Sequence, residues 1–241
     1  MPLDHTPCPV ETASTRERLR NGTLLSAVRA DPPPGMKPCS DAELEASLAR
    51  TLREHPSGSD LYVFGYGSLM WNPALEYTQA LKAYIHGWRR SFCLRLFVGR
   101  GSLQKPGLMM GLDRGEGCHG IAFRIPAAKV HEELRLLWRR EMAWGSYEPR
   151  WVDARSEGQT LRVLTFVVPR HQERYAGALS DEQVAEFIAT GRGSLGTCRT
   201  YFESTLRMLE TIGVNDAGME RIRQALAGFD QRVAAESGVD L

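Results

Sequence analysis

The sequence predicts an α+β protein in which a small mixed β-barrel of about six or seven strands is surrounded by helices. Short apolar or alternating runs, separated by glycine-bearing turns, fill residues 61–126 and return at 147–168 after a single helix. Evenly spaced short strands of this kind are typical of a closed or nearly closed sheet. The last third of the chain instead has helical periodicity, which places helices around the barrel.

The predicted strands cover residues 61–64, 80–88, 91–98, 108–112, 121–125, 147–154 and 161–168. The last two are joined by Ser156-Glu157-Gly158, a hairpin turn. Helices are predicted at 127–144, 180–190, 199–212 and 219–235, and Ser180 with Gln183 forms a capping box for the second of these.

Two parts are expected along the chain: an N-terminal extension with a helical arm (1–59) and the main domain with a helical C-terminal part (60–241). Residues 1–12 are expected to be disordered, and one helix is predicted from Ser14 to about residue 30. A capping box at Ser40 and Glu43 opens a second helix over 41–55. The arm is interpreted as a packing accessory to the main domain.

The composition excludes several classes of function. Among 241 residues, 30 Lys and Arg balance 29 Asp and Glu, so the chain lacks the one-sided charge that holds nucleic acid or an anionic membrane. Five cysteines without a C-x-x-C pair argue against a zinc site or a disulfide framework and suit a reducing compartment. With neither a signal peptide nor an apolar span, we expect a cytoplasmic protein without a metal. The sequence does not indicate an oligomeric state.

The segment Leu61–Pro73, LYVFGYGSLMWNP, is the centre of the prediction. A strand runs directly into Gly65-Tyr66-Gly67-Ser68, where two glycines are expected to bend the backbone through φ > 0 and leave N–H groups uncovered. Such a loop at the end of a strand presents backbone donors to an anion. It is predicted to hold a carboxylate.

A second candidate, Glu141, is found on the predicted helix 127–144. At 3.6 residues per turn it lies about 20° from both Val130 and Leu134, in the middle of an apolar stripe. A carboxylate on a core-facing stripe must be paired or acquire a raised pKa, and the second case makes a general base. The alternative, left open by helix position alone, is that Glu141 simply bonds a buried arginine or a backbone N–H.

Other chemistries fit the sequence less well. The third glycine of a dinucleotide-binding G-x-G-x-x-G is replaced by Met70, and neither a P-loop nor G-x-S-x-G is present. The six histidines are scattered and are given no ligand role. A group of arginines brackets one strand and is expected to be largely solvated: Arg89, Arg90, Arg95 and Arg100.

The motif 63–73 resembles the opening motif of the ChaC family of γ-glutamylcyclotransferases. The resemblance spans about residues 60–215 and continues through 87–92, 105–107, 118–125, Arg140-Glu141 and 193–201. It implies a small β-barrel with helices and a reaction that releases 5-oxoproline from a γ-glutamyl group, classed as a carbon–nitrogen lyase. The implied substrate is glutathione, with Cys-Gly as the second product and no cofactor.

The resemblance also implies roles for residues of this chain. Glu141 would act as general base and then as general acid. Tyr201 matches a tyrosine of the last motif, as possible pocket lining. The residues that would grip the γ-glutamyl group are Gly65, Tyr66, Gly67, Ser68, Leu69 and Met70. For Ser68 a plain turn residue, and for Tyr66 a core aromatic, are the structural alternatives.

The chain departs from animal family members at three places. Residues 142–147 are two residues longer before the tyrosine, Cys198 replaces an asparagine, and the arm has no counterpart in the shortest members. These differences concern the substrate range. Two alternative functions are kept: cyclotransfer on other γ-glutamyl peptides or amines, and a non-catalytic glutathione-binding regulator linked to cation transport.

Overall fold

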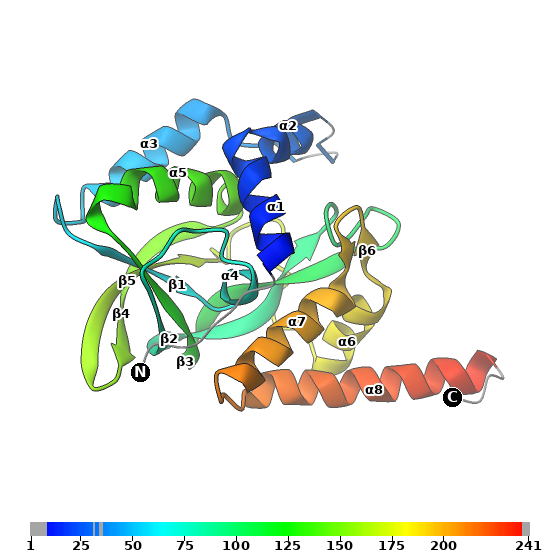
Figure 1. The fold of residues 1–241 in the computed structure, drawn as a ribbon. Helices are drawn as coiled ribbons and strands as arrows, with labels where there is room; N and C mark the ends of the chain where they lie inside the picture. The colour runs from blue at the N-terminus through cyan, green and yellow to red at the C-terminus, as the bar shows by residue number, and fades with distance from the viewer. Residues whose placement is uncertain (1–8, 31, 34–35, 238–241) are drawn as a thin grey trace. The chain divides into compact units, whose positions relative to one another are not determined.

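The computed structural model describes residues 9–30, 32–33 and 36–237, with side chains from Thr15 onward (Figure 1). Most of the predicted disordered segment, residues 1–8, lies outside the described residues, but helix α1 already begins at Pro9. The chain forms two compact units. The first comprises Met1–Arg90 and Leu112–Pro169, and the second Ser91–Gly111 and Arg170–Leu241.

A closed five-stranded barrel, in the order β1-β3-β2-β4-β5, organises the first unit. Strand β1 runs antiparallel to β3 and parallel to β5, and β4 runs antiparallel to β5, so the predicted mixed barrel is confirmed. The strands are β1 (Leu61–Gly65), β2 (Gln79–Leu96), β3 (Gly107–Ile125), β4 (Glu148–Ser156) and β5 (Gln159–Val167).

The barrel has fewer strands than predicted because two pairs of predicted strands are continuous. Segments 80–88 and 91–98 form β2, and 108–112 and 121–125 form β3. Glycines interpreted as turn markers lie inside β3, where they allow close packing. A Cβ at Gly115 would be 2.6 Å from Cδ of Arg89, and one at Gly117 would overlap with the Tyr84 hydroxyl. By contrast, the predicted β4–β5 hairpin is present, with positive φ at Glu157 and Gly158.

The helices of the first unit are α1 (Pro9–Arg20), α2 (Thr23–Ala30), α3 (Asp41–Leu52), α4 (Ser68–Trp71), the 3₁₀ turn η1 (Ala127–Lys129) and α5 (Val130–Glu141). The single helix expected from Ser14 is interrupted near Gly22, where φ is +75°. The capping box of Ser40 and Glu43 at the start of α3 is confirmed. Helices α3 and α5 lie side by side next to the barrel, and α1 also contacts α5 (Figure 1).

Helix α5 is anchored to the barrel by aromatic packing. Trp138 is 1% exposed and meets the ring of Phe166 edge-on at 5.5 Å. Phe64 and Phe123 are also fully buried. Because a buried tryptophan contributes a large apolar area, this contact fixes the C-terminal half of α5 and with it Glu141, three residues further on.

The second unit contains α6 (Asp181–Thr190), the short strands β6 (Arg192–Gly193) and β7 (Gly196–Thr197), α7 (Cys198–Thr211) and α8 (Ala217–Ser237). Helix α6 packs against both α7 and α8, and it begins with the predicted capping box at Ser180. The three predicted helices are thus confirmed, with ends shifted by at most two residues.

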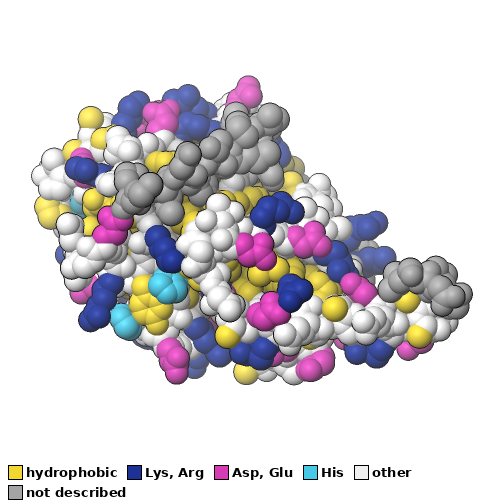
Figure 2. All heavy atoms as spheres, turned by 60° about the horizontal axis from the view of Figure 1, so that its bottom comes forward, with side chains coloured by type: hydrophobic (Ala, Val, Ile, Leu, Met, Phe, Trp, Pro, Cys, Tyr) yellow, Lys and Arg dark blue, Asp and Glu magenta, His cyan; other side chains and the backbone are white. Residues whose placement is uncertain are grey.

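The surface carries charges of both signs. On the face drawn in Figure 2, Lys and Arg side chains are interspersed with Asp and Glu. Within the described part of the chain, no helix is long and apolar enough to cross a membrane.

Candidate active site

The predicted loop joins β1 to α4, and Gly65 is required there for space. Gly67 has φ −135° and ψ −127°, and Gly65 is not among the glycines with positive φ, so the predicted bend through φ > 0 is wrong. A Cβ at Gly65 would instead lie 2.9 Å from Cβ of Leu69 and 3.3 Å from Phe123. The loop is therefore packed too closely for any side chain at Gly65.

Three of the predicted binding residues bury their side chains beneath the loop. Leu69 is 5% and Met70 0% exposed, and the Tyr66 hydroxyl donates a hydrogen bond of 2.9 Å to the carbonyl of Phe166. Tyr66 is thus a hydrogen-bonded core aromatic. The N–H of Met70 is also taken, because it donates to the carbonyl of Gly67 at 2.9 Å. The binding role of these residues stays a prediction.

Arg90 holds the loop from β2. Its Nε donates to the carbonyl of Tyr66 at 2.6 Å, and its Nη2 donates to the carbonyl of His119 at 2.6 Å. The expectation that this arginine is solvated is wrong, because both bonds are partly buried. Charge-assisted bonds of this length fix the carbonyl side of the loop and so the direction of its N–H groups.

Glu141 is the last residue of α5, and its side chain points inward, as its place on the apolar stripe predicts. The side chain is 14% exposed. Its Oε1 atom is buried and lies 2.9 Å from Nε of Arg140. Among the described residues, Oε1 makes no hydrogen bond of good geometry. Burial raises the pKa of Glu141, while the neighbouring Arg140 charge acts in the opposite direction. A lone pair therefore remains for a substrate proton.

Arg140 joins the acid to the loop. Beside its ion pair with Glu141, its Nη2 donates to Oγ of Ser68 at 3.0 Å and its Nη1 to the carbonyl of Asn72. One guanidinium thus positions two residues that were predicted to work together. Sequence reasoning assigned no role to Arg140 itself, and its place beside Glu141 in the motif Arg140-Glu141 was the signal that pointed to it.

Tyr201 belongs to the second unit, on α7. It is 4% exposed, its ring lies 6.3 Å from that of Phe92, and the Arg100 guanidinium is 5.8 Å from its centroid. The Cys198 thiol, one turn earlier, donates to the carbonyl of Arg100 at 3.1 Å. These contacts fix the tyrosine within its own unit, and its role as pocket lining stays a prediction.

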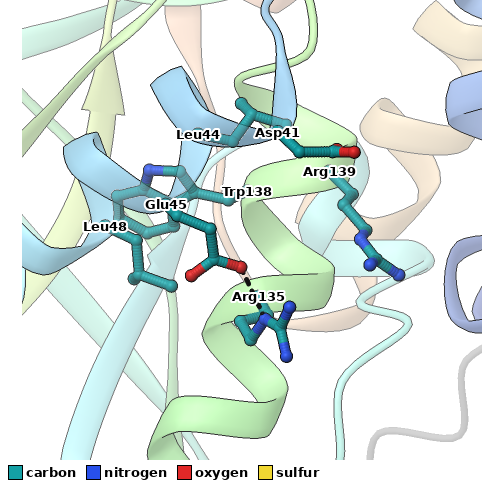
Figure 3. A pocket seen from close by; sticks show the side chains of 7 residues that line it. All are labelled: Asp41, Leu44, Glu45, Leu48, Arg135, Trp138 and Arg139. Carbon is teal, nitrogen blue, oxygen red and sulfur yellow. Dashed lines mark hydrogen bonds and ion pairs between the residues drawn. The ribbon is translucent and has the colours of Figure 1, made fainter.

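A cavity of about 150 Å³ lies elsewhere, between α3 and α5 (Figure 3). An ion pair between Arg135 and Glu45 spans it at 2.7 Å. None of its lining residues belongs to the predicted site: Asp41, Leu44, Glu45, Leu48, Arg135, Trp138 and Arg139. The cavity separates two packed helices and does not reach the loop or Glu141 by any lining residue. Within the described residues, no group of His, Cys, Asp and Glu could hold a metal ion.

The loop, its supporting arginines and Glu141 all lie within the segment of the chain that matches a known family. The family model described as ChaC-like protein matches residues 61–228, which is most of the chain. The chain belongs to this family. A relative from Escherichia coli, named glutathione-specific γ-glutamylcyclotransferase, is 42% identical over 72% of this chain and 76% of its own length. Another from Rattus norvegicus, glutathione-specific γ-glutamylcyclotransferase 1, is 29% identical over 85% and 92%.

Solved structures agree on the fold. A crystal structure of a γ-glutamyl cyclotransferase specific to glutathione from yeast superposes with a TM-score of 0.62 at 19% identity, covering 71% of this chain and 99% of that one. This confirms the predicted α+β barrel class.

Proposed function

We propose that this protein cyclises the γ-glutamyl group of glutathione to 5-oxoproline and releases Cys-Gly. The family membership and the 42% identity to the Escherichia coli enzyme named for this reaction support the class of activity. The observation that carries the mechanism is the buried carboxylate of Glu141, tied through Arg140 to the loop at Ser68.

The reaction needs one proton acceptor that later becomes a donor. Glu141 removes a proton from the substrate α-ammonium, and the freed amine attacks the γ-carbonyl to form the new C–N bond. The bond between the γ-carbon and the cysteine nitrogen then breaks as the protonated Glu141 donates its proton to that nitrogen. The ring nitrogen gives up its second proton to the regenerated carboxylate, and this proton ends on the amine of Cys-Gly, which leaves as an ammonium group. Burial favours this exchange because it raises the pKa of Glu141 above its usual value and so makes the carboxylate a stronger base.

The loop fixes the position of the γ-glutamyl group. Backbone N–H groups at Gly67 and Ser68 bind the α-carboxylate of the γ-glutamyl group, and the fixed carboxylate holds the amine next to Glu141. A ring closes only when the amine and the γ-carbonyl approach each other, so holding the folded substrate supplies much of the acceleration. Arg140 keeps the hydroxyl of Ser68 and the acid in one fixed geometry.

The predicted cytoplasmic location is consistent with the thiols. The four described cysteines, Cys39, Cys93, Cys118 and Cys198, are all unpaired as disulfides. Free thiols are the normal state in a reducing compartment, where reduced glutathione is also the abundant form.

The direct test is incubation of the purified protein with glutathione, followed by chromatography for 5-oxoproline and Cys-Gly. Equal amounts of both products, formed in proportion to protein and time, are expected. Parallel incubation with γ-glutamyl-alanine separates a glutathione-specific enzyme from a general γ-glutamyl cyclotransferase. Tight binding of glutathione without any turnover would favour the regulatory alternative and would contradict the proposal.

A further inference from the structure

The N-terminal arm, α1 and α2, precedes the segment 61–228 that the family model matches. Its described contacts do not simply cover the surface of the first unit. Several meet at residues 72–76, here called the 72–76 turn, which directly follows α4. Because α4 carries Ser68, this turn is the C-terminal anchor of the predicted substrate loop.

The strongest of these contacts is a buried ion pair. Both terminal nitrogens of Arg16 donate to the two oxygens of Glu133 at 2.6 Å, and the Glu133 side chain is 0% exposed. Glu133 also accepts from the backbone N–H of Glu76 at 3.0 Å, and Arg16 bonds the Glu76 carboxylate at 2.9 Å. The arm, α5 and the 72–76 turn therefore share one hydrogen-bonded cluster. A carboxylate buried this deeply requires its arginine.

The same arginine supports an unusual backbone conformation. Arg16 Nη1 donates to the carbonyl of Ala74 at 3.1 Å, and Ala74 has φ +51°. A residue other than glycine persists in this region only where the surroundings hold it. Ala74 is 1% exposed and packs with Leu19 of the arm and Leu136 of α5. The arm thus supplies both a bond and an apolar contact that keep the turn in place.

A second series of hydrogen bonds connects the arm to the loop through Asn72. Its Nδ2 donates to Oγ1 of Thr15 at 3.1 Å, and its carbonyl accepts from Nη1 of Arg140. Arg140 in turn bonds Ser68 and pairs with Glu141. Only Asn72 therefore separates the arm from the arginine that holds the site.

We propose that the N-terminal arm is a positioning element of the active site, in which Thr15 and Arg16 fix the 72–76 turn and thereby the place of Ser68 and Arg140 relative to Glu141. The inference rests on the proposed function for its kinetic consequence. The cyclisation requires a bound substrate in one folded geometry, and a misplacement of about 1 Å can cost on the order of 10²-fold in rate. The arm is then required for turnover in this chain through the contacts of Thr15 and Arg16 with the 72–76 turn.

The test compares Thr15→Val and Arg16→Ala with a control on the same helix, Arg18→Ala. Arg18 is exposed, and the bond it makes with the Thr23 hydroxyl uses its backbone carbonyl, which alanine keeps. We expect kcat/KM for glutathione to fall about tenfold for Thr15→Val and on the order of 10²-fold for Arg16→Ala, with Arg18→Ala unchanged. Arg16→Lys should recover only part of the loss, because an ammonium cannot make the bidentate contact.

Amide hydrogen exchange supplies a readout independent of turnover. Thr15→Val and Arg16→Ala should speed exchange in residues 66–76 while the amides of β4 and β5 exchange as in the wild type. If Arg16→Ala does not fold, the double variant Arg16→Met with Glu133→Met removes the pair without leaving a buried charge. That variant should fold, exchange faster at 66–76 and lose activity.

The outcomes separate the two proposals. Wild-type kinetics and wild-type exchange at 66–76 in folded Thr15→Val and in the folded arginine variants would overturn the positioning role. A uniform loss of protection across the barrel, matched by the fall in melting temperature, would also overturn it, since that is a purely structural effect. A wild-type protein that makes no 5-oxoproline contradicts the proposed function alone, and the exchange measurement still decides the role of the arm.

Discussion

The Nε atom of Arg140 lies 2.9 Å from Oε1 of Glu141, so the candidate acid is paired with its own neighbour in the sequence. The same guanidinium extends to the substrate loop at Ser68. The ion pair lowers the free-energy cost of burying the charged form of Glu141. It does not cancel that cost, because burial still raises the pKa of Glu141. Five expected outcomes follow from these contacts and from the packing around them.

Glu141→Gln should abolish the formation of 5-oxoproline while the protein stays folded. Glutamine keeps the shape of the side chain and removes the proton acceptor, so kcat should fall by about 10²–10⁴-fold, the usual contribution of a general base. Chromatography of the products and circular dichroism measure the two effects. A fully active, folded variant would refute the assignment of Glu141.

The pH dependence should carry the signature of a buried acid. Because the pKa of Glu141 is raised, kcat/KM should increase with pH through a value above the usual pKa of about 4.3 for glutamate. A raised pKa in the folded state also means that the ionised form disfavours folding. The contribution of Glu141 to the free energy of unfolding is therefore fully present below its unfolded pKa and is lost as pH rises through the folded pKa.

The control for this stability effect is Glu141→Gln, whose side chain does not titrate. Relative to this variant, the wild type should lose free energy of unfolding between the unfolded and the folded pKa of Glu141. Urea denaturation at several pH values measures the difference. Parallel curves for the two proteins across that range would show that the acid is not desolvated.

Arg140→Met and Arg140→Lys should have different kinetic effects. The Arg140 charge lowers the pKa of Glu141, so its loss in Arg140→Met should raise that pKa further. The increase of kcat/KM with pH should then occur at higher pH. Lysine keeps a positive charge but cannot bond Ser68 and Glu141 together. Arg140→Lys should therefore keep the wild-type pH dependence of kcat/KM and raise KM for glutathione. The pH–rate profiles of both variants test this, and an unchanged pH dependence in Arg140→Met would contradict it.

Gly65→Ala should damage both the loop and the fold around it. The added Cβ would come within 2.9 Å of Leu69 and 3.3 Å of Phe123, so the loop must move. Overpacking of this kind costs about 1–3 kcal/mol. Gly228→Ala in α8 is the matched control, since its Cβ would be 3.8 Å from Nη1 of Arg232, the end of a flexible side chain. Wild-type activity and stability of Gly65→Ala would show that the loop tolerates a shift.

Glu133→Ala should be more destabilising than Glu132→Ala, although the two residues are neighbours on α5. Glu133 is 0% exposed, and its loss leaves the mostly buried Arg16 with only the half-exposed Glu76 as an ionic partner and removes the acceptor of the Glu76 backbone N–H, which costs about 3 kcal/mol. Glu132 is 45% exposed in its pair with Arg20, and such surface pairs contribute about 0–1 kcal/mol. Urea unfolding of both variants gives the comparison, and equal losses would contradict the burial argument.

Local features of the fold were predictable because their signals lie within a few residues. The capping boxes at Ser40 and Ser180 and the β4–β5 hairpin are of this kind. The inward orientation of the Glu141 side chain is another. The number of strands was not, because glycine marks a turn and a close contact alike, as Gly115 and Gly117 do within β3.

The supporting contacts of the site could not be predicted from residue patterns. Arg140 and Ser68 are 72 positions apart, and Asn72 and Thr15 are 57 positions apart. A hydrogen bond across such a separation depends on how the elements pack and leaves no periodic trace in the sequence. Glu133 was missed for the same reason, since its partner Arg16 lies in the arm.

Helix α5 carries both the anchor of the arm, Glu133, and the candidate acid, Glu141, eight positions apart. Each added or deleted residue between them would rotate one relative to the other by about 100° and shift it by about 1.5 Å along the axis. The number of residues in this stretch is therefore fixed by geometry. A change in chain length is therefore tolerable only outside this stretch, for example in residues 142–147, which follow the helix.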